Sequence, residues 1–110
     1  MTWEQAQAIA LKLPGTAPGS YHGYPAVRVQ GRFLMRRGDD PDTLEFKALG
    51  PAERDLLMAA RPDVFFLPEA KRGTAMLFAR LPALDAAALD DILARRWRAI
   101  APTALKGTAR

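Results

Sequence analysis

Residues 24–47 read YPAVRVQGRFLMRRGDDPDTLEFK, and the spacing of their apolar side chains decides the fold. Apolar residues recur at every second position, which is the period of a β-strand with one buried face. Gly31 and the run Gly38–Asp42 interrupt this alternation, and Gly, Pro and Asp favour turns. The stretch therefore predicts three antiparallel strands. The apolar residues of these strands are Val27, Val29, Phe33, Met35, Leu44 and Phe46.

The first turn of this stretch can close in two ways, and the choice decides which side chains are buried. A two-residue turn at 30–31 would pair Val29 with Arg32 and divide the apolar residues between the two faces. A three-residue loop over 30–32 pairs Val29 with Phe33 and keeps one face apolar. The periodicity favours the three-residue loop. Its expected pairs are Val29 with Phe33 and Val27 with Met35.

Helices are predicted before and after these strands. Thr2 followed by Gln5 fits a capping box, and apolar residues at helical spacing predict an amphipathic helix over 2–13. Residues 14–23 are rich in Gly, Pro and small polar side chains, so they are predicted to form a loop. Pro51 suits the first turn of a second helix. The residues of that helix expected to face inward are Leu56, Leu57 and Ala60.

The C-terminal half adds a second hairpin and a last helix. The runs Val64–Leu67 and Thr74–Leu81 are typical of strands, joined across Pro68–Gly73. Asp85 is a suitable N-cap for the last helix. Residues 103–110 lack an apolar period and are expected to fray. The buried stripe expected on the last helix is Leu89, Ile92, Leu93, Trp97 and Ile100.

The predicted order is α-β-β-β-α-β-β-α, which is an α+β fold with helices packed on one face of an antiparallel sheet. A length of 110 residues and a hydrophobic content of 49% fit a single domain over 1–110. The side chains expected to be buried together are Val27, Val29, Phe33, Phe46, Leu93 and Trp97.

The composition argues against several kinds of chemistry. The chain has no cysteine, which excludes disulfides and cysteine metal sites, and its one histidine, His22, excludes a histidine-rich site. A catalytic pair of Ser20 and His22 is disfavoured, because adjacent side chains in an extended loop point apart and no acidic residue can be assigned to orient the histidine. No GxxxxGK[ST] or GxGxxG sequence supplies a nucleotide cradle. We therefore expect no metal, no organic cofactor and no enzymatic activity.

The sequence also shows no pattern typical of a membrane span or a targeting signal. No stretch approaches the 18 or so apolar residues that span a membrane, and the N-terminus lacks a basic region followed by an apolar run. A cytoplasmic protein without a membrane partner is expected.

Charge favours an anionic partner. The chain has 16 Lys and Arg against 12 Asp and Glu, a net charge of +4. In the predicted register, Arg28, Arg36 and Lys47 share the face opposite the apolar residues. Glu45 lies on the same face, so a solvated surface of mixed charge is the alternative interpretation. The cations expected at the hairpin tips are Arg32 at the first tip and Lys71 and Arg72 at the second.

Residues 22–33, HGYPAVRVQGRF, resemble the signature of the MmcQ/YjbR family: Gly, one residue, Pro, an alternating strand, Gly, a basic residue and an aromatic. Two departures are His22, where an aromatic is often found, and Arg32, where Lys is frequent. Arginine keeps the charge and suits bidentate phosphate contact. Further matching segments follow in order over nearly the whole chain. They are Leu13–Gly15, Leu44–Lys47, Pro51–Leu57, Arg61–Phe65, Arg80–Leu81 and Leu89–Pro102.

The resemblance implies a CyaY-like, frataxin-like α+β sandwich and a double wing of two β-hairpins that contacts DNA. The alternative is a non-enzymatic protein-interaction module that uses the exposed sheet surface. Salt dependence separates the two, because phosphate binding weakens steeply as counterions compete. The residues expected to bind DNA are Arg28, Arg32, Arg36, Arg37, Lys47, Lys71 and Arg72.

Overall fold

The computed structural model describes residues 1–107 and confirms the predicted α+β class. The strands are β1 (Thr16–Tyr21), β2 (Tyr24–Val29), β3 (Arg32–Arg37), β4 (Thr43–Lys47), β5 (Phe65–Phe66) and β6 (Met76–Arg80). The helices are α1 (Trp3–Ala10), α2 (Pro51–Ala60), α3 (Ala86–Ile100) and α4 (Thr103–Lys106), with the short 3-10 helices η1 (Glu69–Lys71) and η2 (Leu81–Ala83).

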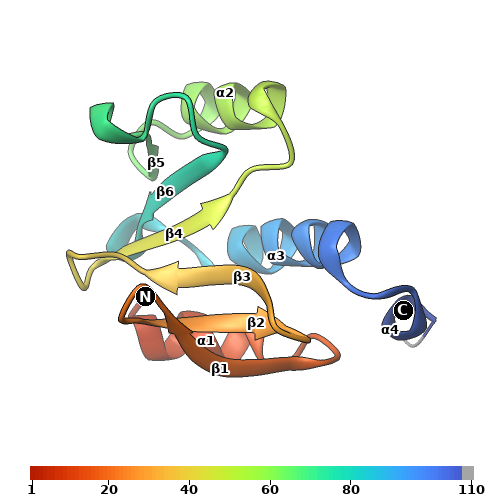
Figure 1. Ribbon diagram of the computed structural model, residues 1–110. Helices are drawn as coiled ribbons and strands as arrows, with labels where there is room; N and C mark the ends of the chain where they lie inside the picture. The colour runs from red at the N-terminus through yellow and green to blue at the C-terminus, as the bar shows by residue number, and fades with distance from the viewer. Residues whose placement is uncertain (108–110) are drawn as a thin grey trace.

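The six strands form one antiparallel sheet in the order β1-β2-β3-β4-β6-β5. Helices α1 and α3 pack against each other and against one face of the sheet (Figure 1). That face carries the hydrophobic core, which includes Val27, Val29, Phe46, Leu93 and Trp97 as predicted. We call the opposite face the open face.

Strand β1 replaces the loop predicted over 14–23, so that prediction is wrong. A two-residue turn at His22 and Gly23, with φ of 51° and 83°, joins β1 to β2. Positive φ at both central residues is the geometry of a type I′ hairpin turn. An edge strand tolerates Pro18 and Gly19, because one side of it needs no partner. The exposed side chains of β1 explain the missing apolar alternation.

The first predicted hairpin register is also wrong at its tip. Gln30 and Gly31, with φ of 51° and 82°, form a two-residue turn that pairs Val29 with Arg32. Phe33 therefore pairs with Arg28 and lies on the open face, outside the core where it was expected. A β-bulge then restores the predicted pairing of Val27 with Met35. The extra residue is Leu34, which is fully buried, and so the hairpin keeps its apolar face.

Helix α2 is less buried than its sequence predicts. Leu56 is 69% exposed and Ala60 is also exposed, whereas Leu57 packs against the core. The helix lies beside the short strand β5 at one end of the sheet, so only a narrow stripe is covered (Figure 1).

Both ends of the described chain are tied to the core. The capping box between Thr2 and Gln5 is present, although α1 ends at Ala10 rather than near residue 13. Residues 103–106, expected to fray, form α4, and Leu105 packs against the core. Residues 108–110 of the expected tail lie outside the described residues. Trp97 Nε1 donates a hydrogen bond of 2.8 Å to the Pro14 carbonyl, which joins α3 to the end of the first helical segment.

Candidate nucleic-acid interface

One row of residues crosses all six strands on the open face. Its members are paired in succession and are Gly19, Ala26, Arg36, Glu45, Phe78 and Phe66. The centre of the row is charged and its β5 end is aromatic. The row therefore has small residues at its β1–β2 end, a buried ion pair at its centre and two phenylalanines at its β5 end, which we call the aromatic half of the open face.

The ion pair at the centre joins Arg36 to Glu45. Arg36 is 8% exposed and Glu45 is 2% exposed. Arg36 donates from Nε and Nη2 to the same oxygen, Glu45 Oε2, at 2.9 Å and 2.5 Å. Its guanidinium also lies 4.7 Å from the centre of the Tyr24 ring. Because Glu45 neutralises the cation and the sheet buries it, Arg36 offers little charge to a phosphate.

Arg28, by contrast, keeps its charge uncompensated. Its Nε and Nη2 donate to the Ser20 carbonyl and its Nη1 donates to the Gly31 carbonyl, at 2.8–3.2 Å. The guanidinium lies 5.4 Å from the centre of the Tyr21 ring. Carbonyls fix the direction of the side chain without cancelling its charge, so Arg28 is a cation held in place on the open face.

Arg32 and Arg37 belong to the helix-covered face. Arg32 pairs with the buried Val29, and its Nη1 donates a 2.5 Å hydrogen bond to the Ile100 carbonyl at the end of α3. Arg37 pairs with the buried Leu44, and its Nε is buried without a hydrogen-bond partner. Neither side chain joins the cations of the open face.

The second tip carries Lys71 and Arg72. Arg72 is exposed and forms an ion pair of 3.1 Å with Glu69, which is also exposed. Figure 1 shows η1 and the β2–β3 turn at different ends of the sheet. The family resemblance implies two hairpin tips that act together as wings. In the structure the two tips lie apart, so Arg32 and Arg72 do not form one surface.

Arg80 was missed by the sequence reasoning. It is exposed on the open face, where it pairs with Thr43 and its guanidinium lies 4.2 Å from the centre of the Phe66 ring. Lys47 faces the same way two residues along β4 from Glu45. The alternation of β6 could have revealed Arg80, because it stands two positions after Phe78. We call Arg28, Lys47 and Arg80 the open-face cations.

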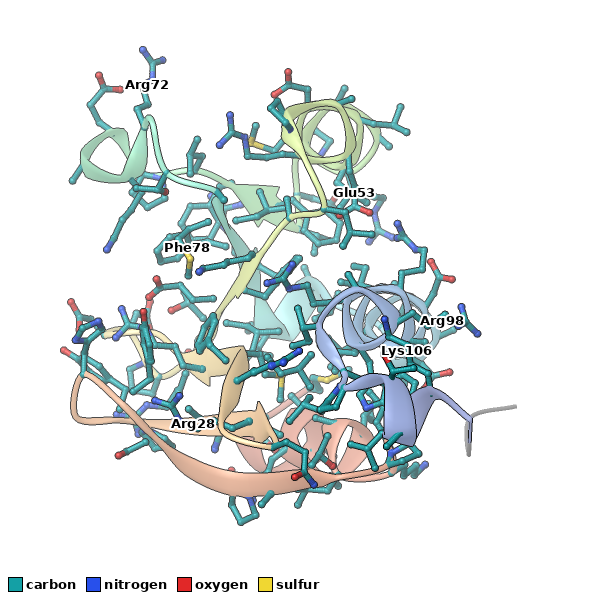
Figure 2. The ribbon with its side chains drawn as sticks, turned by 45° about the vertical axis from the view of Figure 1, so that its right-hand side comes forward. Arg28, Glu53, Arg72, Phe78, Arg98 and Lys106 are labelled. Carbon is teal, nitrogen blue, oxygen red and sulfur yellow. The ribbon has the colours of Figure 1, made fainter. Side chains whose placement is uncertain are left out.

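A second basic cluster lies on α3 and is structural. Arg95 forms ion pairs with Glu53 of α2 and with Asp91 one turn earlier, the latter at 3.2 Å. Figure 2 shows Glu53 directed toward α3. Burial lowers the pKa of the Arg96 guanidinium, and the nearby Glu53 opposes this shift. These arginines dock α2 onto α3 on the helix side of the sheet.

A groove of about 360 Å³ opens on the aromatic half of the open face. Phe66 and Phe78 contribute its apolar wall, with ring centres 5.5 Å apart and an interplanar angle of 42°. Its full lining is Arg36, Asp39, Asp40, Thr43, Glu45, Phe66, Pro68, Ala70, Lys71 and Phe78.

Other chemistry finds little support. His22 occupies a hairpin turn with its ring edge against Tyr21, at 4.2 Å between ring centres. Among residues 1–107, no group of three or more His, Cys, Asp or Glu side chains is arranged to hold a metal ion. No helix in that range has both the length and the apolar character needed to cross a membrane.

Comparison with protein-family models, with curated proteins and with solved structures found no match. The resemblance to the MmcQ/YjbR family and to the CyaY-like fold therefore stays a prediction from the sequence.

Proposed function

We propose that this protein binds DNA and that the phosphates contact the open face of the sheet rather than the hairpin tips. The observation that carries this proposal is the arrangement of the open-face cations. Arg28, Lys47 and Arg80 come from three different strands, point to one side of the sheet, and have no ion pair with an acid within the described chain.

The spacing of these cations suits a phosphate backbone. Along the strands, Arg80 stands four residues from the level of Lys47, because Arg80 pairs with Thr43 and Lys47 pairs with Met76. Across the sheet, neighbouring strands lie about 4.8 Å apart, so strands β2, β4 and β6 spread the three cations over roughly 15 Å. That length of duplex axis carries on the order of nine negative charges. Lys71 lies partly buried at the edge of the same face and extends the positive surface toward η1. Of the seven residues expected from the sequence, the proposal relies on Arg28, Lys47 and Lys71, and it adds Arg80.

The second candidate function is protein interaction through the same face. Tyr21, Tyr24, Phe33 and Phe66 are all partly exposed there, and partly exposed aromatic side chains are common at protein interfaces. The two functions differ in their response to salt, because releasing counterions from DNA makes phosphate binding steeply salt-dependent.

The test is a fluorescence-anisotropy titration of the full chain with two unrelated labelled duplexes and one labelled single strand. Measurements at 50 and 200 mM salt should show a steep loss of affinity on raising the salt, similar for both duplexes, since phosphate contacts carry no sequence information. No measurable binding to any of these probes at low salt would overturn the proposal and favour the protein-interaction alternative.

A further inference from the structure

We infer that the groove between η1 and the β3–β4 turn holds one unstacked nucleobase, so that the preferred ligand is a single-stranded nucleic acid. The inference rests on the proposed DNA binding and names the part of the ligand that the phosphate contacts leave undefined. It follows from three features of the groove: its shape, its aromatic wall and its unpaired polar atoms.

The groove is bounded by two segments that stand above the sheet. The β3–β4 turn supplies Asp39 and Asp40, and the segment around η1 supplies Pro68, Ala70 and Lys71. Figure 2 shows Phe78 between these two segments. The space of about 360 Å³ falls in the range of pockets that enclose small ligands, so one planar ring fits it better than a helix or a duplex.

Aromatic rings line the groove. Phe66 and Phe78 are cross-strand partners, and Phe66 already carries the Arg80 guanidinium over its ring at 4.2 Å. Stacking of a base on an aromatic side chain contributes about 1–3 kcal/mol, which corresponds to roughly a 5- to 150-fold change in affinity. All nucleobases have a flat π-face, so this contact favours single strands without selecting a sequence.

The polar floor of the groove has one acceptor and one donor unused. Both hydrogen bonds of the central ion pair use Glu45 Oε2, which leaves Glu45 Oε1 and Arg36 Nη1 without a partner within residues 1–107. The fully buried and unpartnered side-chain atoms of this range are the Nε atoms of Arg37, Arg54 and Arg96, so the two unused atoms keep contact with solvent. A ligand in the groove can take the place of that solvent as their hydrogen-bond partner.

The Arg36 and Glu45 side chains offer a donor and an acceptor to a ligand in the groove. The Watson–Crick edge of every base presents a donor beside an acceptor, and single-strand binding proteins recognise unstacked bases along that edge. The Arg36 and Glu45 side chains that line the groove can therefore hydrogen-bond such an edge.

The charged residues around the groove set the side on which the backbone of a bound nucleic acid passes. Asp39 and Asp40 on the turn repel phosphate, whereas Lys71 on the opposite wall attracts it. With a base in the groove, the sugar-phosphate backbone is expected to pass on the Lys71 side and to continue toward the open-face cations.

The experiment compares two labelled strands of equal length, an oligo(dT) and a strand in which every position is abasic. The parent chain should bind oligo(dT) roughly 5- to 150-fold more tightly at the same salt concentration. Phe66→Ala should remove this difference. Because Phe66 also supports the Arg80 guanidinium, the affinity for the abasic strand is expected to fall as well, and the ratio of the two affinities is the readout. Phe33→Ala is the matched control, because Phe33 lies on the same face but packs on Tyr21 at 4.5 Å and is not part of the groove.

A second variant covers the case in which Phe66→Ala is unfolded by circular dichroism. Ala70→Leu fills the groove from the exposed η1 segment without removing a core contact, and it should also abolish the difference between the two strands. Equal affinity of the parent for both strands would overturn the base pocket while the DNA-binding proposal stands. A difference that persists in folded Ala70→Leu would also overturn it, and no binding of either strand at low salt would remove the proposed function itself.

Discussion

The cations at the hairpin tips and the cations in the middle of the open face have opposite fates in the folded protein. At the tips, Arg32 is held by the Ile100 carbonyl on the helix side, and Arg72 is paired with Glu69. On the open face, Arg28, Lys47 and Arg80 form no ion pair with an acid among residues 1–107. A cation of this sheet is therefore available to a ligand where it faces the open side and no acid neutralises it, whereas Arg36 faces the same side and is neutralised by Glu45.

The largest expected effect concerns the ion pair that divides the open face. Glu45→Ala leaves the buried Arg36 uncompensated, and breaking such a pair costs about 3–5 kcal/mol of unfolding free energy. Urea denaturation followed by circular dichroism measures the loss. The matched control is Glu69→Ala at the tip, where the ion pair is exposed and the expected loss is under about 1 kcal/mol. Equal losses in the two variants would show that the central ion pair is not buried.

The next effect tests the open-face cations directly. The double change Lys47→Ala with Arg80→Ala should lower the slope of log affinity against log salt by roughly 2, because each cation neutralises about one phosphate. Titration of a labelled strand at four salt concentrations provides the slope. An unchanged slope in a folded variant would exclude these two residues from the interface.

A smaller effect is expected from the geometry of the first tip. Gly31→Ala places a Cβ at φ of 82°, and a residue other than glycine in this region costs about 1–2 kcal/mol. The cost is one of backbone strain alone, since no atom lies within 4 Å of the added Cβ. Urea denaturation should show this loss while the affinity for DNA stays unchanged, and a loss of affinity would instead indicate that the tip contacts the ligand.

The smallest effect is expected from the tip arginines themselves. Arg32→Ala with Arg72→Ala should change stability by no more than about 0.5 kcal/mol, as for other exposed residues. The salt slope should fall by clearly less than in the Lys47 and Arg80 double variant, because Arg32 belongs to the helix-covered face and Arg72 is paired with Glu69. A fall of about 2 would instead support the double wing expected from the sequence.

Much of the candidate site was accessible from the sequence, because alternation along a strand is a local property. The alternation placed Arg28, Arg36 and Lys47 on the face opposite the core, where the pairing of the strands puts them. The same reasoning overlooked Arg80 only because it did not extend the alternation along β6. The alternation could not show which acid or carbonyl each charged side chain contacts. The pairing of Arg36 with Glu45 and the capture of Arg32 by Ile100 join residues that are 9 and 68 positions apart.

The sequence by itself determined the α+β class, the capping box of α1, the last helix and most of the core. These features depend on local periodicity and on capping residues, which act over a few positions. Tertiary structure alone decided that residues 16–21 form an edge strand, that a bulge at Leu34 puts Phe33 on the open face, and that Phe66 and Phe78 line one wall of a groove. Each of these depends on which strand lies beside which, and backbone hydrogen bonds between distant segments set that choice without leaving a local pattern in the chain.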